Sequence, residues 1–191
     1  MSERRDFISK IPNTLTFTRI ALSPVIMLMC LYLPQEYMIV RSISGTLFIV
    51  LCLTDLLDGY IARKYKTISE FGIVSDNISD KILVNVALIS LLKLDKVSPI
   101  VVTLMICRDI TISGLREYAA KKQESISVST WGKIKTFIQM TAISILIISK
   151  KDVSGSFNNN IYIIGTMLIW ATAVLSVITL YNYIKRFIEK S

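Results

Sequence analysis

The sequence predicts an all-α integral membrane protein with six transmembrane helices and a short N-terminal juxtamembrane helix. Hydrophobic residues make up 52% of the chain and charged residues only 19%. The mean hydropathy is correspondingly positive, at +0.56. Apolar stretches of the length needed to cross a bilayer core of about 30 Å recur along the chain. Because the connections between them are short, we expect residues 1–191 to form a single membrane domain.

The N-terminal residues 1–13 form a charged, amphipathic leader. We expect it to lie along the membrane surface as a short helix, with Phe7, Ile8 and Ile11 dipping into the lipid. The first span follows at about residues 14–34. It is too long for the apolar region of a removable signal peptide, and no small-residue cleavage site follows it.

Five further spans are expected at about residues 39–58, 77–94, 98–120, 130–149 and 161–184. A polar stretch of 17 residues, 59–75, lies between Asp58 at the end of the second span and Asp76 just before the third. The fourth span contains Arg108 well inside its apolar stretch, and the fifth opens with Trp131 and Gly132. A loop with Gly155 and residues 158–160, all asparagine, precedes the sixth span.

The distribution of Lys and Arg predicts the orientation in the membrane. With the N-terminus in the cytoplasm, only five of the 22 cationic residues fall on the far side: Arg41, Lys93, Lys96, Lys150 and Lys151. Both termini are therefore expected in the cytoplasm, in a multi-pass protein of the cytoplasmic (inner) cell membrane. This asymmetry accounts for most of the net charge of +8, with attraction to anionic membrane lipid as a second contribution. We expect no nucleic-acid partner.

The chain contains no histidine, which excludes Ser-His-Asp and Cys-His nucleophiles and histidine metal ligands. The three cysteines lie in apolar runs without a CxxC pair, so a zinc site is not expected. Acid–base chemistry must then come from carboxylates, Lys, Tyr, Cys or a metal-bound group.

Four aspartates flank the polar stretch between the second and third spans. Asp55 and Asp58 are three residues apart and share a helix face, as do Asp76 and Asp80, which are four apart. If the two spans are antiparallel neighbours, the four carboxylates converge and require a compensating cation. Arginine side chains, with Arg63 nearby, are one way to supply it. Two Mg²⁺ or Mn²⁺ ions about 4 Å apart suit an all-oxygen set better. The alternative is that the aspartates are solvated residues beside a loop.

The same stretch resembles the signature of the CDP-alcohol phosphatidyltransferase family. It matches all eight fixed positions in the order Asp55-x₂-Asp58-Gly59-x₂-Ala62-Arg63-x₈-Gly72-x₃-Asp76-x₃-Asp80. The resemblance implies a six-span fold in which a CDP-linked lipid, CDP-diacylglycerol, donates its phosphatidyl group to an alcohol and releases CMP. One departure is Asn77, where bacterial members usually have proline, which concerns only the start of the third span.

The resemblance also implies roles for individual residues. Asp55 and Asp76 would bridge two divalent cations, Asp58 and Asp80 would complete their shells, and Asp80 would be the general base. The residues implied to bind the CDP-lipid are Asn13, Thr16, Gly59, Arg63 and Ser69. For Asn13 and Thr16 an ordinary helix cap is an equally good interpretation.

Basic residues of the fourth and fifth spans predict an anion pocket. Arg108 and Arg116 lie on roughly one helix face, and Lys133 and Lys135 open the fifth span on the same side of the membrane. An intramembrane arginine indicates a functional site, and we interpret the four as a pocket for a phosphate on the acceptor. Alternatively, Arg108 pairs with Asp109 or Asp80, and the two lysines only anchor the helix at the interface.

These segments resemble those of family members that use sn-glycerol 3-phosphate as the acceptor. Sibling activities with inositol phosphate, serine or phosphatidylglycerol are the nearest alternatives. A divalent-cation transporter is the alternative from another class, because intramembrane aspartates also line ion paths. Since family members are commonly homodimers, we expect a homodimer.

Overall fold

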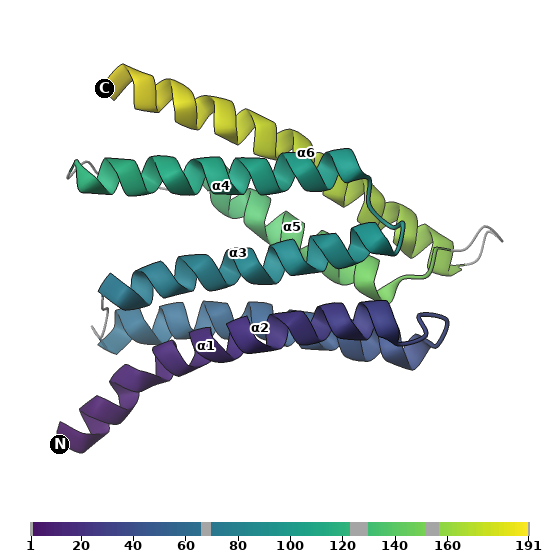
Figure 1. Cartoon of the computed structure of the whole chain (residues 1–191), viewed down its shortest axis with the longest axis horizontal. Coiled ribbons are helices and arrows are strands. Elements are labelled where there is room, and N and C mark those ends of the chain that lie inside the picture. Colours follow the sequence, from purple (N-terminus) through teal and green to yellow (C-terminus); the bar gives the residue numbers. More distant parts are fainter. Residues whose placement is uncertain (1, 66–69, 123–129, 152–156, 191) are drawn as a thin grey trace. The chain divides into compact units, whose positions relative to one another are not determined.

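The computed structural model describes residues 2–65, 70–122, 130–151 and 157–190, with side chains placed for most of them but not for 2–13 or 56–65. All regular structure in these ranges is helical (Figure 1), which confirms the predicted all-α class. The helices are α1 (Ser2–Tyr32), α2 (Met38–Tyr65), α3 (Glu70–Lys93), α4 (Pro99–Lys121), α5 (Thr130–Ile148) and α6 (Phe157–Lys190).

Three of these helices are long and apolar enough to cross a membrane. The segments are Thr14–Tyr32 in α1, Met38–Asp55 in α2 and Asn159–Lys185 in α6. The helices α3, α4 and α5 coincide with the other predicted spans, but each carries charged residues inside its apolar stretch, among them Asp80, Arg108 and Lys135. That all six helices span the membrane therefore stays a prediction.

Several helices extend beyond the predicted spans. The leader and the first span form one continuous helix, α1. Helix α2 continues through Gly59 to Tyr65, and α3 already begins at Glu70, so the predicted polar stretch is helical at both ends. A single glycine inside a helix costs only about 1 kcal/mol. With no proline between Pro34 and Pro99, nothing in the sequence forces the helices to stop earlier.

The helices fall into two compact units, residues Met1–Leu94 and Asp95–Ser191. In the first unit, α1 packs against both α2 and α3. The core of this unit is apolar and includes Ile26, Phe48, Leu83 and Leu88, which are at most 1% exposed. Helix α1 is therefore the element through which the acidic helices α2 and α3 are held.

In the second unit, α6 packs against α4 and α5 around Met105, Ile143 and Ile169. Gly165 permits close packing of α6 on α5. A Cβ atom at this position would lie 2.9 Å from Ile145 Cγ2, closer than van der Waals contact allows.

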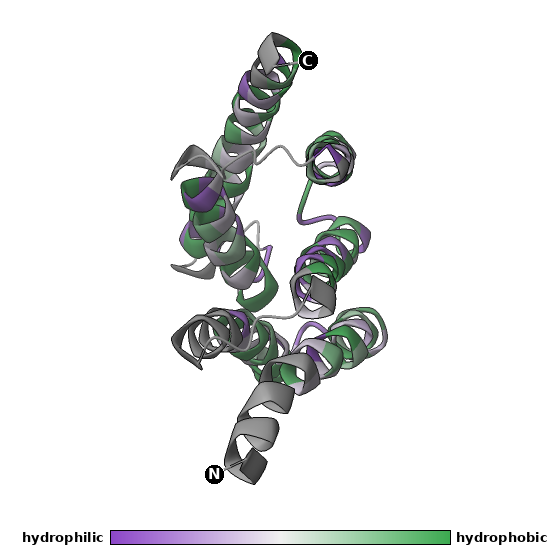
Figure 2. Ribbon diagram, turned by 90° about the vertical axis from the view of Figure 1, so that its left-hand side faces the viewer, coloured by the Kyte–Doolittle hydropathy of each residue, from purple (hydrophilic) through white to green (hydrophobic). Residues whose placement is uncertain are grey.

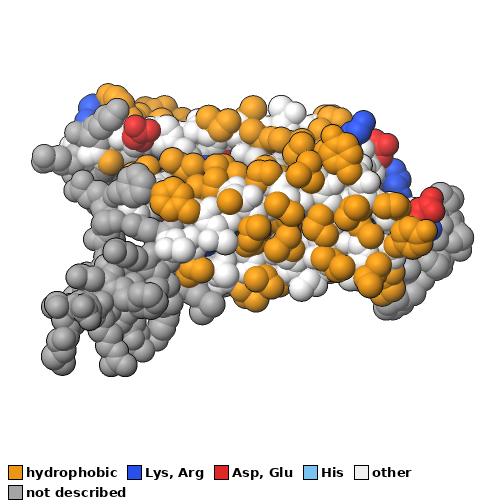
Figure 3. All heavy atoms as spheres, turned by 60° about the horizontal axis from the view of Figure 1, so that its bottom comes forward, with side chains coloured by type: hydrophobic (Ala, Val, Ile, Leu, Met, Phe, Trp, Pro, Cys, Tyr) orange, Lys and Arg blue, Asp and Glu red, His pale blue; other side chains and the backbone are white. Residues whose placement is uncertain are grey.

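Large apolar side chains also cover much of the outer surface. In the view of Figure 3, hydrophobic side chains are spread over much of the described surface and charged side chains are few. Exposed residues of this kind include Phe17, Leu28, Ile43 and Leu53. In Figure 2 most described helical turns are accordingly green or pale. Such continuous apolar exposure suits contact with lipid and not with water.

Candidate functional site

The acidic faces of α2 and α3 meet in the first unit. Asp55 of α2 and Asp76 and Asp80 of α3 each place a carboxylate oxygen within 4.8 Å of the others. The predicted convergence of the two faces is therefore seen for these three aspartates. The side chain of Asp58, the fourth, lies outside the described residues.

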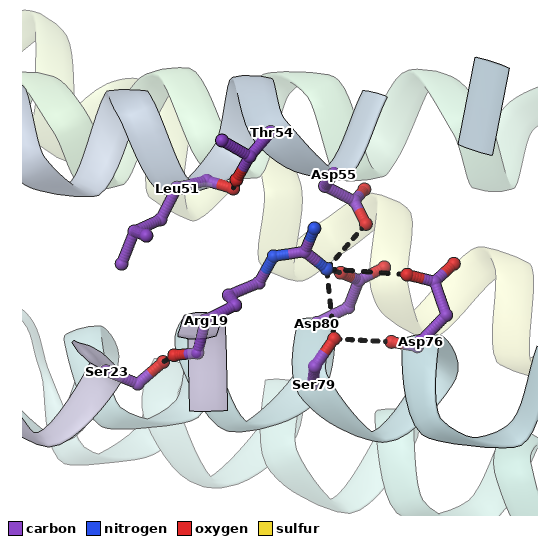
Figure 4. Close-up of polar contacts among 8 residues, drawn as sticks. All are labelled: Arg19, Ser23, Leu51, Thr54, Asp55, Asp76, Ser79 and Asp80. Carbon is purple, nitrogen blue, oxygen red and sulfur yellow. Dashed lines mark hydrogen bonds and ion pairs between the residues drawn. The ribbon is translucent and has the colours of Figure 1, made fainter. Parts of the chain in front are cut away.

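A buried arginine from α1 lies at the centre of this cluster (Figure 4). Arg19 Nη1 donates to Asp55 Oδ1 at 2.8 Å, to Asp80 Oδ1 at 2.9 Å and, more weakly, to Asp76 Oδ1 at 3.4 Å. The same nitrogen donates to Ser79 Oγ at 2.9 Å, while that hydroxyl donates to the Asp76 carbonyl. One guanidinium thus links all three helices of the unit.

Arg19 was not among the site residues predicted from the sequence. It was counted as a cytoplasmic cation and as the last residue of Pro12-Asn13-x₂-Thr16-x₂-Arg19, which resembles the family's entry to the first span, but it was given no role. The prediction did state that arginine side chains were one way to offset the aspartates. The available signal was its place five residues into the first span, where an isolated charge requires a partner. Its partners lie 36 to 61 residues further along the chain, so local spacing did not indicate them.

The cluster remains negatively charged after this pairing. Three carboxylates face one guanidinium, which leaves a formal charge of about −2 among these four groups at neutral pH. Asp76 precedes the predicted third span. Burial of its carboxyl, and secondly the negative charge of Asp55, raise the pKa of Asp76 above its ordinary value. Hard oxygen donors this close together, with charge left to neutralise, fit a divalent cation such as Mg²⁺ or Mn²⁺.

The two aspartates of α3 are the most exposed members of the cluster. The side chains of Asp76 and Asp80 are 41% and 36% exposed, that of Asp55 is 15% exposed, and Arg19 is fully buried. A cation or an anionic substrate can therefore reach the two aspartates of α3 without passing the guanidinium.

The structure describes one of the five predicted CDP-lipid residues in full. Thr16 is buried on α1, one turn before Arg19, and so lies on the α1 face that approaches the carboxylates. Ser69 and the side chains of Asn13 and Arg63 lie outside the described residues, and Gly59 is described only as a backbone position within α2.

Two of the predicted acceptor-pocket residues meet in the second unit. Arg108 Nη1 and Lys135 Nζ both donate to Asp109 Oδ1, at 2.8 Å and 3.1 Å, so one carboxylate joins α4 to α5. Arg108 Nη2 also donates to Thr179 Oγ1 of α6 at 3.1 Å. The local pairing of Arg108 with Asp109, an alternative from the sequence, is therefore observed.

The other two basic residues lie elsewhere in this unit. Arg116 is half-buried, with its guanidinium 5.8 Å from the ring centroid of Tyr183 on α6. Lys133 is exposed, whereas Lys135 is only 1% exposed. Residues two apart on a helix do not share a face, so Lys133 does not join Lys135 at Asp109.

Comparison with known proteins shows the family. The model of the CDP-alcohol phosphatidyltransferase family matches residues 9–178, and the chain belongs to this family. A relative from Rickettsia felis is 42% identical over 175 residues, which cover 92% of this chain and 93% of the relative. Relatives from Haemophilus influenzae and Bacillus subtilis are 34% and 31% identical over similar shares of both chains. All three are named CDP-diacylglycerol–glycerol-3-phosphate 3-phosphatidyltransferase.

Proposed function

We propose that this chain transfers the phosphatidyl group of CDP-diacylglycerol to sn-glycerol 3-phosphate, giving phosphatidylglycerophosphate and CMP. The observation that carries the proposal is the convergence of Asp55, Asp76 and Asp80 in a chain of this family. The near full-length similarity to relatives named for this reaction supports the choice of acceptor.

The four signature aspartates would hold two divalent cations, Mg²⁺ or Mn²⁺, which when bound neutralise the diphosphate of the donor. Asp80 would accept the proton of the acceptor hydroxyl, and its partial exposure leaves it accessible to that hydroxyl. The acceptor oxygen forms a bond to the phosphorus of the phosphatidyl group. The bond from that phosphorus to the oxygen shared with CMP breaks, and CMP leaves with the bonding electron pair.

The CDP-lipid would be bound by Asn13 and Thr16 of α1, by Gly59 and Arg63 in the last two turns of α2, and by Ser69. Arg63 carries a planar, permanently charged guanidinium suited to diphosphate oxygens. Gly59 has no side chain to obstruct close approach. Asn13, Thr16 and Ser69 would supply the neutral polar contacts. The buried position of Thr16, one turn from Arg19, supports its place beside the carboxylates.

The phosphate of the acceptor would bind to basic residues of the second unit. Arg108 and Lys135 are held together by Asp109, so this group carries a formal charge of about +1 in a largely buried setting. A buried positive group of this kind favours an anion over a neutral alcohol such as serine. Arg116 and Lys133, which lie apart from Asp109, would supply further positive charge for the anion.

We further propose that all six helices span the cytoplasmic membrane, with both termini and the site in the cytoplasm, and that the protein is a homodimer. The positive-inside distribution of Lys and Arg supports the orientation. A cytoplasmic site is also where water-soluble glycerol 3-phosphate would reach a donor held in the inner leaflet.

An acceptor panel tests the proposal. Purified protein in detergent with CDP-diacylglycerol and Mg²⁺ is supplied in turn with glycerol 3-phosphate, inositol phosphate, serine and phosphatidylglycerol, and CMP release is measured. We expect release with glycerol 3-phosphate at least tenfold faster than with the other three. Faster release with another acceptor would assign the chain to a sibling activity, and no release with any acceptor would refute phosphatidyl transfer.

A further inference from the structure

The position of Arg19 gives this residue a function that the family signature does not contain. We propose that Arg19 is a positioning residue of the metal site, whose charge holds Asp55, Asp76 and Asp80 together before a divalent cation binds and opposes that cation when it arrives. This inference rests on the proposed function, because it takes the aspartates to be metal ligands.

The hydrogen-bonding capacity of the guanidinium supports this role. Nη1 of Arg19 has two hydrogens, yet four acceptor oxygens lie between 2.8 Å and 3.4 Å from it. One nitrogen cannot satisfy all four at once. Arg19 therefore gathers three carboxylates with a single positive charge, which compensates their negative charge only in part, and a second cation can complete this compensation.

Burial separates the position of Arg19 from the route of an arriving ion. Arg19 is fully buried, while Asp76 and Asp80 are more than one third exposed. A divalent cation can thus reach the partly exposed carboxylates of α3, while Arg19 stays buried at the centre of the cluster. A guanidinium in hydrogen-bond contact with the same carboxylates repels the cation electrostatically. Metal affinity is therefore lower than the carboxylates alone would provide.

The same contacts give Arg19 a second effect, on the stability of the metal-free protein. Its side chain joins α1 to the acidic residues of α2 and α3, helices that α1 also contacts directly. Without Arg19 the partly buried carboxylates would repel one another with no arginine between them. A divalent cation on the same carboxylates would replace the missing charge.

The two effects predict opposite changes in one variant. Arg19→Gln should unfold at a lower temperature than wild type in EDTA, and should bind Mn²⁺ about tenfold more tightly, a difference of about 1.4 kcal/mol. Arg19→Lys keeps the charge, so its Mn²⁺ affinity should stay within about threefold of wild type. A residue with a purely structural role would lower stability without tightening Mn²⁺ binding.

The experiment is a titration of full-length protein in detergent with Mn²⁺, counting free Mn²⁺ by electron paramagnetic resonance in the absence of substrates. Arg41→Gln is the matched control. Arg41 is also a buried arginine of the first unit, but it donates to the backbone carbonyls of Gln35 and Glu36. This variant should lose stability without gaining Mn²⁺ affinity.

Each outcome decides the inference. If folded Arg19→Gln binds Mn²⁺ as tightly as wild type or more weakly, the inference is overturned. It is also overturned if Arg41→Gln binds Mn²⁺ more tightly by the same amount as Arg19→Gln. If Arg19→Gln folds only with Mn²⁺ present, the inference is supported; if Mn²⁺ does not restore folding, it is overturned. Failure of wild type to bind Mn²⁺ would instead remove the metal site on which the proposed function depends.

Discussion

The carboxylate of Asp109 is predicted to stabilise the second unit by compensating buried Lys135 and half-buried Arg108. It accepts hydrogen bonds from Arg108 at 2.8 Å and Lys135 at 3.1 Å, and the side chain of Lys135 is only 2% exposed. Removing one partner of a buried ion pair costs about 3–5 kcal/mol, because the other charge is left uncompensated. An amide in place of the carboxylate would still accept one hydrogen bond, so we expect Asp109→Asn to cost about 3 kcal/mol.

A double-mutant cycle tests this reasoning. Adding Lys135→Met to Asp109→Asn removes one of the two uncompensated cations, so the double variant should be more stable than the sum of the two single changes by at least about 1 kcal/mol. Unfolding free energies are measured by SDS titration in mixed micelles, with Lys133→Met, at an exposed position, as a control expected within about 0.5 kcal/mol of wild type. Simple additivity, or a cost for Asp109→Asn below about 0.5 kcal/mol, would refute the assigned role.

Four further predictions concern catalysis and packing. Asp80→Asn should lower kcat at least about 100-fold while CDP-diacylglycerol binding persists. Asp95→Asn, at an exposed position, is the control and should keep its kcat. Normal turnover by Asp80→Asn would exclude Asp80 as the base. Chelation should abolish CMP release and Mg²⁺ or Mn²⁺ should restore it, whereas activity surviving exhaustive chelation would contradict metal dependence. Arg116→Ala should raise the KM for glycerol 3-phosphate about tenfold, and that for CDP-diacylglycerol much less; equal increases would remove Arg116 from the acceptor pocket. Gly165→Ala should destabilise the protein by about 1–3 kcal/mol through its clash with α5. Gly114→Ala, with no atom within 4 Å of the added carbon, should not destabilise it, and equal thermal shifts for the two would contradict the packing.

The features that follow a local period were predictable from the sequence. Apolar stretches located all six helices, and their spacing put Asp76 and Asp80 on one helix face. That this face meets Asp55 was expected only if the two spans were antiparallel neighbours. The ends of the helices were less predictable. Gly59 interrupts the apolar pattern of α2 but not its backbone hydrogen bonding, so the helix continues to Tyr65.

Contacts between distant residues needed the structure. Arg19 meets carboxylates from two other helices, and Lys135 meets Asp109 across 26 residues. The sequence shows that each of these charges lies in an apolar stretch and requires a partner, but several partners were available to each. Packing of the helices selects among them. The exposure of Lys133 beside buried Lys135 depends in the same way on which face of α5 turns inward.

The most direct test of the central claim is identification of the lipid product. Purified protein is incubated with CDP-diacylglycerol, carbon-13-labelled glycerol 3-phosphate and Mg²⁺, and the lipids are examined by mass spectrometry. We predict phosphatidylglycerophosphate carrying the labelled glycerol, formed in equal amount to CMP and absent with Asp80→Asn. CMP released without a labelled lipid, or no consumption of CDP-diacylglycerol, would contradict the account.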